Sequence, residues 1–511
     1  MKLVKSLLLG SAAGLIAVGG AQAADLPVKA KAVEYVKICS LYGAGFYYIP
    51  GTDTCIKLGG YLRADAAIHA TDFNPYASGT GGAENRLSNY YYFRAREDLN
   101  IDTRTATEYG VVRTFADLTF SWTTGGYSGT GAGATGYDVI SGTTSSAPGN
   151  ASGGNIAGGA LGVYYAFIQF AGFTMGKAVS QFSAPWTNYP ANNFDGLVGN
   201  GGTVTGVTQF TYTADFGQGM TLALSAQDPT VYYQGGVVNA SLATSAGIVG
   251  GSLGGSAYGG TRSPDLVAAF RADQAWGLFQ ASVAAHDNHV AYYGATETSG
   301  HPDDKWGWAG QLALSIKNIP TGAGDTINMS GVYTNGASFY NFQDLAPHAW
   351  SMFGGTGLAG AYQSVGFATL TDSVFIPGSG QELTTTYGFS GGYTHNWDPY
   401  WNTSLYGSYG AVRYNSTAKG FICGTAAMGA LLTAGSTCNP DFNYWVIGTK
   451  TGWTPVKNLT FSADVNYSEI DTKYAGSVAY GGSTVTAKPA AIYEIKNQGT
   501  VSLLLRAQRN W

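Results

Sequence analysis

Charged side chains gather near the N-terminus in three segments where they recur at every second position. The segments read IKLGGYLRADAAIHA (56–70), FRAREDLNID (93–102) and GVVRTFADLTF (110–120). Guanidinium, ammonium and carboxylate groups held close together attract and sort ions by electrostatics, without any bond being made or broken. These residue types therefore point to the handling of charged species rather than to covalent catalysis.

Successive side chains of a β-strand point to opposite faces, so the alternation assigns these groups to one face of three strands. The candidate functional residues on that face are Lys57, Tyr61, Arg63, Arg94, Arg96, Arg113 and Asp117, with Arg271 and Lys450 added from distant segments. Consecutive antiparallel strands are neighbours, so we expect four of the arginines to form one basic wall. The alternative is a set of scattered charges, each paired with Asp65, Asp98 or Asp117.

The rest of the chain supplies many further segments with this two-residue period. We predict sixteen strands, at 55–69, 89–104, 108–122, 161–171, 172–180, 205–216, 218–228, 264–274, 276–288, 305–317, 325–337, 382–396, 399–414, 441–453, 457–469 and 498–511. A further irregular segment near 357–372 is assigned to a loop. The chain is therefore expected to be all-β and to form a single domain.

The connections between these strands alternate in length, with eight long ones and seven short ones. This pattern is typical of a transmembrane β-barrel, which has an even number of antiparallel strands, short periplasmic turns and long extracellular loops. A soluble β-sandwich gives no reason for all the long loops to lie at one end. The expected fold is a 16-stranded antiparallel transmembrane β-barrel.

Two strands indicate which face meets lipid. In KWGWAGQLALSIK (305–317), one face carries two Trp followed by aliphatic residues, and aromatic residues favour the membrane interface. In LTFSADVNYSE (459–469), the other face carries Asp464 and Asn466, which would lack partners in a packed core. Sixteen strands enclose a lumen wide enough for water. We expect apolar faces to meet lipid and polar faces to meet a water-filled lumen.

The third long loop, 181–204, is the candidate for a constriction. Its only charged residue is Asp195. If the loop folds into the lumen, it narrows the pore, and Asp195 would face the basic wall and set an electric field across the opening. The alternative is an ordinary surface loop.

The N-terminus has the features of an export signal. Lys2 and Lys5 precede an apolar run, and Ala21-Gln22-Ala23 fits a signal-peptidase site. We expect residues 1–23 to be a signal peptide, 24–54 an N-terminal periplasmic segment, and 55–511 the barrel. The remaining chain lacks an apolar run long enough for a membrane helix. A net charge of −5 argues against a nucleic-acid partner.

Export favours disulfides among the four cysteines, Cys39, Cys55, Cys423 and Cys438. Three pairings are possible, and proximity in the sequence favours Cys39 with Cys55 and Cys423 with Cys438. Signals for an enzyme, a metal site or any cofactor are weak. A GxSxG match at 250–254 lies in a Gly/Ser-rich loop without the strand and helix that a nucleophile elbow needs.

Residues 32–63, AVEYVKICSLYGAGFYYIPGTDTCIKLGGYLR, resemble the N-terminal signature of the alphaproteobacterial general porin family. YYAFIQFAGFTMGK (164–177) resembles the hairpin of that family's fourth and fifth strands, and the ending LLRAQRNW resembles its last strand. Two features depart from the family. Ala507 stands where an aromatic residue is usual, and the loop at 181–204 has little acid.

The resemblance implies a homotrimer of 16-stranded barrels in the bacterial outer membrane, in contact with membrane lipid and lipopolysaccharide, with the third loop folded into each lumen. It implies passive diffusion of small hydrophilic solutes and ions through a water-filled channel, with no catalysis. Two alternatives remain, a solute-specific channel and a surface adhesin built on the same barrel. A solute-specific channel should have aromatic residues along its lumen, and Tyr61 and Phe115 alone are too few to indicate one.

Overall fold

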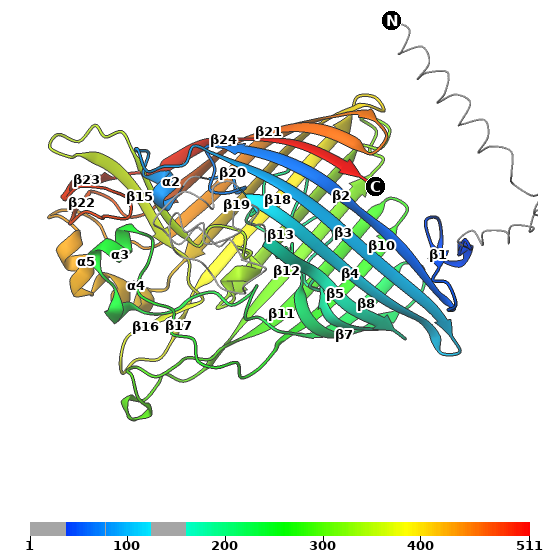
Figure 1. Cartoon of the computed structure of the whole chain (residues 1–511). Coiled ribbons are helices and arrows are strands. Elements are labelled where there is room, and N and C mark those ends of the chain that lie inside the picture. Colours follow the sequence, from blue (N-terminus) through cyan, green and yellow to red (C-terminus); the bar gives the residue numbers. More distant parts are fainter. Residues whose placement is uncertain (1–36, 77, 124–159) are drawn as a thin grey trace, which may run out of the picture.

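The chain forms a closed antiparallel β-barrel, as the sequence predicted (Figure 1). The computed structural model describes residues 37–76, 78–123 and 160–511. The barrel closes where the first long strand, β2 (Thr54–Ile68), pairs with the last, β24 (Gln498–Asn510). The predicted signal peptide at 1–23 lies outside the described residues, and its cleavage stays a prediction.

Sixteen strands make the wall, and every neighbouring pair is antiparallel. After β2 they are β3 (Tyr91–Thr107), β4 (Gly110–Thr123), β5 (Ala160–Phe170), β6 (Phe173–Ala178), β7 (Val207–Asp215), β8 (Met220–Gln227), β10 (Asp265–Gln274), β11 (Gly277–Asn288), β12 (Lys305–Lys317), β13 (Thr326–Asn335), β18 (Thr385–Asn396), β19 (Trp401–Arg413), β20 (Phe442–Val456), β21 (Leu459–Thr472) and β24. Each lies within a few residues of its predicted position.

The apolar faces of the strands form the outer surface. On β12, Trp306, Trp308 and Leu312 are 46%, 49% and 62% exposed, and on β21 Phe461 and Val465 are each 41% exposed. Aromatic side chains stack along this surface, as in the pair Trp401 and Trp453, whose ring centroids are 5.7 Å apart. This is the arrangement that a lipid-facing wall requires.

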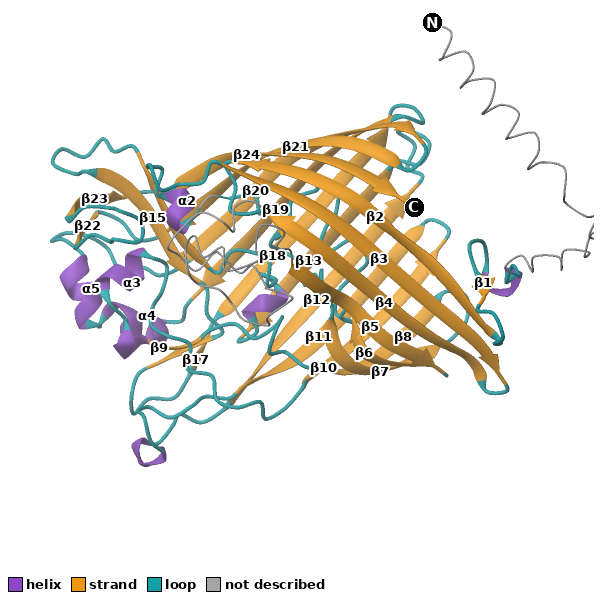
Figure 2. Ribbon diagram, viewed as in Figure 1, coloured by secondary structure: helices purple, strands orange, loops and turns teal. Residues whose placement is uncertain are grey.

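The long connections gather at one end of the barrel and contain structure of their own (Figure 2). Strands β14 (Ala349–Gly354), β15 (Gln363–Thr369), β22 (Ser477–Tyr480) and β23 (Ala491–Ile495) form a four-stranded sheet. A three-stranded sheet contains β9 (Val237–Asn239), β16 (Ser373–Phe375) and β17 (Glu382–Leu383). The irregular segment at 357–372 lies in a loop, as predicted, but it contains β15.

Short helices and 3-10 turns complete these loops. The 3-10 turns are Ala240–Leu242, Glu297–Ser299 and Ser338–Tyr340, and a fourth, Ser40–Tyr42, lies in the segment before the barrel. The helices are α2 (Gly79–Gly82), α3 (Ser245–Val249), α4 (Ser416–Cys423) and α5 (Ala426–Leu431). Side-chain caps begin three of them, since Thr244, Asn415 and Thr425 each accept a backbone N–H hydrogen bond. No helix among the described residues is long and apolar enough to cross a membrane.

The lumen is packed over much of its circumference, which the sequence did not predict. Inward-facing Val267, Val332 and Tyr444 are buried in one hydrophobic cluster with the loop residues Phe342 and Trp350. Loop side chains enter the barrel because apolar residues on both surfaces lose water when they meet. The expectation that the polar faces meet water throughout is therefore wrong on this side of the barrel.

Asp464 illustrates the difference. The sequence placed it in water, yet its side chain is fully buried. Its carboxylate accepts hydrogen bonds from the Tyr406 hydroxyl (2.6 Å) and from the Asn193 backbone N–H (2.6 Å). Asn193 belongs to the third long loop, so the partner that makes this burial tolerable comes from a distant segment.

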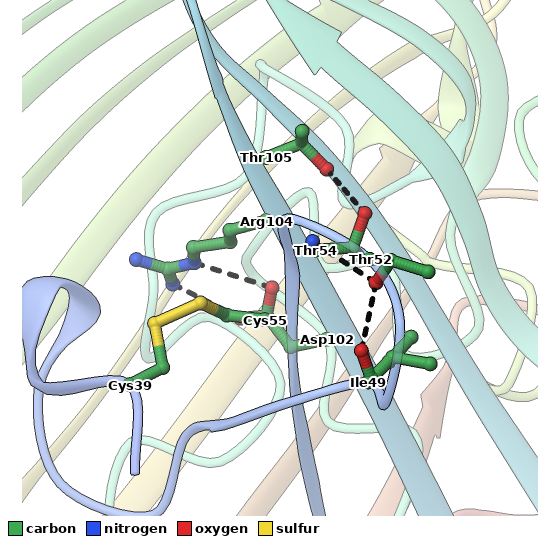
Figure 3. Close-up of a disulfide and its surroundings, with 8 residues drawn as sticks. All are labelled: Cys39, Ile49, Thr52, Thr54, Cys55, Asp102, Arg104 and Thr105. Atoms are coloured by element: carbon green, nitrogen blue, oxygen red, sulfur yellow. Dashed lines mark hydrogen bonds and ion pairs between the residues drawn. A yellow bond between two sulfur atoms is a disulfide. The ribbon is translucent and has the colours of Figure 1, made fainter. Parts of the chain in front are cut away.

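Two disulfides fasten segments at opposite ends of the molecule, with the pairing that sequence proximity favoured. Cys39 joins Cys55 and so ties the segment before the barrel to β2, beside the two-residue strand β1 (Tyr47–Tyr48) (Figure 3). The Arg104 guanidinium lies 4.9 Å from the Phe46 ring of the same segment. Cys423 at the end of α4 joins Cys438 after α5.

Candidate functional site

The third long loop (residues 181–204) folds into the barrel and crosses its lumen. The wall holds it through single hydrogen bonds from several strands. Gln280 of β11 donates to the Gln181 carbonyl (3.1 Å), and Asn328 of β13 donates to the Pro190 carbonyl (3.0 Å). The Gly201 N–H donates to Gln311 of β12 (3.2 Å). These contacts fix the loop's path through the interior.

Glycine is required where the loop lies against the wall. Gly199 has φ +84°, and a Cβ there would lie 2.1 Å from the carbonyl oxygen of Phe389 on β18. Its N–H donates to the Asn341 carbonyl (3.0 Å) of another loop. A residue that accepts positive φ and has no side chain is therefore needed at this point.

Where the loop reaches the opposite wall, it meets a cluster of ionised side chains, the arginine–aspartate cluster (Asp65, Arg94, Asp195 and Arg506). Arg94 of β3 donates two hydrogen bonds to Asp65 Oδ2, from Nε (2.9 Å) and Nη2 (2.7 Å). Arg506 of β24 donates to Asp65 Oδ1 (2.7 Å). One carboxylate therefore serves two guanidinium groups, and all three side chains are less than a tenth exposed.

Asp195 joins this cluster from the loop. Its Oδ2 lies 3.7 Å from Arg94 Nη1, and its Oδ1 accepts a hydrogen bond from the Tyr189 hydroxyl (2.5 Å). Arg506 Nη2 also donates to the Asn193 carbonyl (3.2 Å). The loop thus supplies a negative charge to a mostly positive wall, which is the geometry that a transverse field requires.

The other predicted arginines separate into two kinds. Arg113 donates to both carboxylate oxygens of Asp102 (3.1 and 3.0 Å), which also binds Arg104. Arg63 and Arg96 have no carboxylate oxygen within 4.0 Å among the residues that the structure describes. The predicted wall is therefore neither uniform nor fully neutralised. Asp117 lies beside Asp98, with Arg96 acting on it electrostatically but no arginine nitrogen within 4.0 Å of its carboxylate among the described residues.

A cavity of about 570 Å³ lies between the loop and this wall. We call it the aromatic cavity, and its lining is mainly tyrosine, arginine and aspartate. The lining residues used below are Lys57, Tyr61, Arg63, Arg96, Asp98, Phe115, Asp117, Tyr164, Tyr165, Tyr189 and Val204. Five of the predicted candidates, Lys57, Tyr61, Arg63, Arg96 and Asp117, therefore meet around one space.

Two predicted candidates lie elsewhere. Arg271 of β10 pairs with Asp273 (3.2 Å), and both side chains are more than a third exposed. Lys450 of β20 lies opposite Asp464 in the strand register. Neither lines the aromatic cavity.

Several residues of the site were not predicted. The alternation along β24 puts Arg506 on its polar face, but its contact with Asp65 exists only because the barrel closes. Tyr164 and Tyr165 are adjacent, so strict alternation puts one of them on the lipid face. A register shift between Asp117 and Leu118 against β5 brings both to the cavity. Such a bulge adds an unpaired residue to one strand and redirects its side chain.

The weak enzyme signals gain no support from the geometry. Ser252, at the centre of the GxSxG match, donates its hydroxyl to the Gly254 carbonyl (2.9 Å) instead of contacting a base. Within the described ranges, no three or more His, Cys, Asp and Glu side chains are grouped as metal ligands.

Comparison with known proteins agrees with this architecture. The chain is 35% identical over 229 residues to porin Omp2a of Brucella melitensis, a match covering 43% of this chain and 55% of that protein. It is 32% identical over 335 residues to porin Omp2b of Brucella suis, covering 61% of this chain and 79% of that protein. The chain thus spans about half the length of the first relative.

Among solved structures, the outer membrane channel DcaP of Acinetobacter baumannii has the same fold. The superposition covers 91% of this chain and 99% of DcaP, with a TM-score of 0.56 and 15% identity. The model of the Porin subfamily matches residues 25–504. The chain is therefore a member of the porin subfamily and a barrel of the bacterial outer membrane, as its sequence indicated.

Proposed function

We propose that this protein is a passive diffusion channel for small hydrophilic solutes and ions across the outer membrane, and not an enzyme. Solutes pass between the third loop and the wall of β2 to β5, through the aromatic cavity. Lys57, Arg63 and Arg96 line this path, and the arginine–aspartate cluster lies beside it. The observation that carries the proposal is the third loop, which crosses the lumen but leaves this cavity along one side.

The charges along this path favour anions. Arg63 and Arg96 have no carboxylate oxygen within 4.0 Å among the described residues, whereas both oxygens of Asp65 accept hydrogen bonds from Arg94 and Arg506. Charges in a narrow lumen are poorly screened, because little water and salt separates them from a passing ion.

The test is conductance of the refolded protein in a planar lipid bilayer under a KCl gradient. Stepwise openings with a reversal potential on the anion-selective side are expected. A folded and inserted protein that gives no steps contradicts the proposal. Steps with cation selectivity would support channel function but contradict the role assigned to the arginines.

We further propose that three copies assemble through the outer face of β2 to β4. Glu97 of β3 faces outward, on the same face as Phe93 and Leu99, and no cation lies within 4.0 Å of its carboxylate among the described residues. A carboxylate facing lipid near the middle of a strand is unfavourable. Contact with a second copy would remove it from lipid.

The mass of the detergent-solubilised protein tests this assembly. Three chain masses are expected for the native protein, and Glu97→Lys should shift it toward single chains. Met329→Lys, which places the same side chain on the outer face of β13, is the control and should leave the mass unchanged. A monomeric native protein contradicts the proposal.

A further inference from the structure

Two arginines of the aromatic cavity lie opposite each other in the register of neighbouring strands. Arg63 on β2 and Arg96 on β3 are register partners, and both side chains lie on the lumen face. Like charges directly opposite each other on antiparallel strands are destabilising. An anion bound between the two strands would offset this unfavourable arrangement of charge.

Neighbouring groups hold each guanidinium without neutralising it. Arg63 Nε donates to Gln508 Oε1 (2.9 Å), and Arg96 Nε donates to Ser121 Oγ (2.7 Å). Each also lies over a tyrosine ring, Arg63 at 4.3 Å from Tyr61 and Arg96 at 5.4 Å from Tyr164. Cation–π contacts and neutral acceptors orient an arginine but leave its charge and its other N–H donors available.

Aromatic rings surround the same space. Phe115 and Tyr165 lie with their centroids 6.5 Å apart. The Tyr165 hydroxyl donates to the Val204 carbonyl (2.8 Å), and the Tyr189 hydroxyl is bound to Asp195. Because these hydroxyl groups already have partners, the rings are fixed and contribute mainly their faces. A volume of about 570 Å³ is within the range of small-molecule sites.

Acidic groups limit what can bind. Asp98, Asp102 and Asp117 line the cavity as well, which limits its positive charge. A solute with one carboxylate at one end and an uncharged ring at the other matches this division. A second carboxylate would approach the aspartates.

We propose that the aromatic cavity is a binding subsite for small monocarboxylates that carry a planar ring. Arg63 and Arg96 bind the carboxylate through paired N–H donors, and Phe115 and Tyr165 contact the ring. The inference deepens the proposed function and rests on it, since it makes passage of such solutes saturable. The six aromatic residues of the cavity, Trp511 among them, also meet the requirement for a solute-specific channel, which Tyr61 and Phe115 alone did not.

The first experiment measures the KCl current through single channels at neutral pH as benzoate is added. Benzoate should reduce the current with a saturable concentration dependence. Benzamide has the same shape without the charge and should have less than about a tenth of the effect, because a charged hydrogen-bond partner is lost. Equal effects of benzoate and benzamide overturn the proposal.

Variants identify the residues. Arg63→Gln and Arg96→Gln should each raise the half-saturating benzoate concentration about tenfold or more. Arg96→Lys keeps the charge but not the paired donors. Its half-saturating benzoate concentration should lie between those of the glutamine variants and that of the native protein. Arg413→Gln is the matched control, since Arg413 lies over Tyr387 on the outer face. An unchanged half-saturation in both glutamine variants overturns the assignment.

Calorimetric titration of benzoate into the folded, detergent-solubilised protein separates this site from the channel activity. If no conductance steps occur, the proposed function fails, and the titration still decides the subsite. Saturable heat that disappears in Arg96→Gln supports it, and absence of heat from the native protein overturns it. Heat-dependent mobility on a denaturing gel verifies that each variant has folded.

Discussion

Arg94 and Asp65 face each other across β2 and β3, and the guanidinium donates twice to one oxygen of the carboxylate, at 2.9 and 2.7 Å. The other oxygen of Asp65 binds Arg506 of the last strand. Asp65 therefore has two roles. It neutralises arginines of the lumen wall, and it links the first and last strands where the barrel closes.

Removing this carboxylate should affect both stability and selectivity. Asp65→Asn leaves two buried guanidinium groups without their anion, and breaking a buried pair from one side costs about 3–5 kcal/mol. A lower unfolding midpoint in denaturant is expected, with a reversal potential shifted further toward anions. Asp273→Asn, in the exposed pair with Arg271, should change stability by about 0–1 kcal/mol. Equal effects of the two substitutions would contradict the role of Asp65.

The charge of the third loop can be tested separately. Asp195→Asn should shift the reversal potential toward anions, because it removes the negative group that lies 3.7 Å from Arg94. The shift should be larger at about 0.1 M salt than at about 1 M, because salt screens charges and the field of Asp195 reaches less far at the higher concentration. Asp228→Asn, in the exposed start of the next loop, is the control. Unchanged selectivity in Asp195→Asn contradicts a field set by this loop.

Gly199→Ala should release the third loop from the wall. Its Cβ would lie 2.1 Å from the Phe389 carbonyl oxygen, so the loop must move. We expect a higher single-channel conductance with more current noise. Gly217→Ala is a close control, because φ there is +78° and no atom lies within 4 Å of the added Cβ. Backbone strain alone should lower the stability of that variant, by about 1 kcal/mol. Its conductance should be unchanged.

The disulfide between Cys423 and Cys438 should stabilise its loop rather than the barrel. Closing a loop of this length contributes about 3 kcal/mol by restricting the unfolded chain. Replacing both cysteines with serine should speed proteolysis between β19 and β20 and leave the barrel resistant. Loss of the folded barrel in that variant would show that the loop is needed for assembly.

His348 gives the extracellular loops a dependence on pH. Its ring stacks on Phe339 at 3.9 Å, and burial lowers the pKa of His348 to about 4. The folded state therefore binds fewer protons than the unfolded segment, so stability is present above about pH 6.5 and is lost as pH falls toward 4. Relative to a variant without the imidazole, hydrogen exchange at 338–354 should rise as pH falls across this window.

The control for this effect is His348→Gln, which lacks the imidazole but keeps Asp344 of the same loop, whose pKa burial raises to about 6. Asp344 contributes equally to both proteins, so the difference in their exchange, corrected for the intrinsic pH dependence, isolates His348. A rise of the same size in the variant would assign the effect to another group.

The sequence by itself determined the strands, because a two-residue period is a local property that each segment shows alone. LTFSADVNYSE needs no distant partner to have an apolar and a polar face, and sixteen such segments with alternating loop lengths leave few folds open. The same period predicted that the side chains of Lys57, Arg63, Arg94 and Arg96 face the lumen. The entry of the third loop did not follow from this period, and only the family resemblance implied it.

Only the tertiary structure decided which charges meet and where water remains. Arg506 reaches Asp65 over 441 residues because the barrel closes, and Asp464 is buried because a loop residue satisfies it. Tyr164 reaches the cavity through a bulge that breaks the alternation. Each of these depends on pairing between distant segments, whose partner and register the periodicity of one segment does not encode.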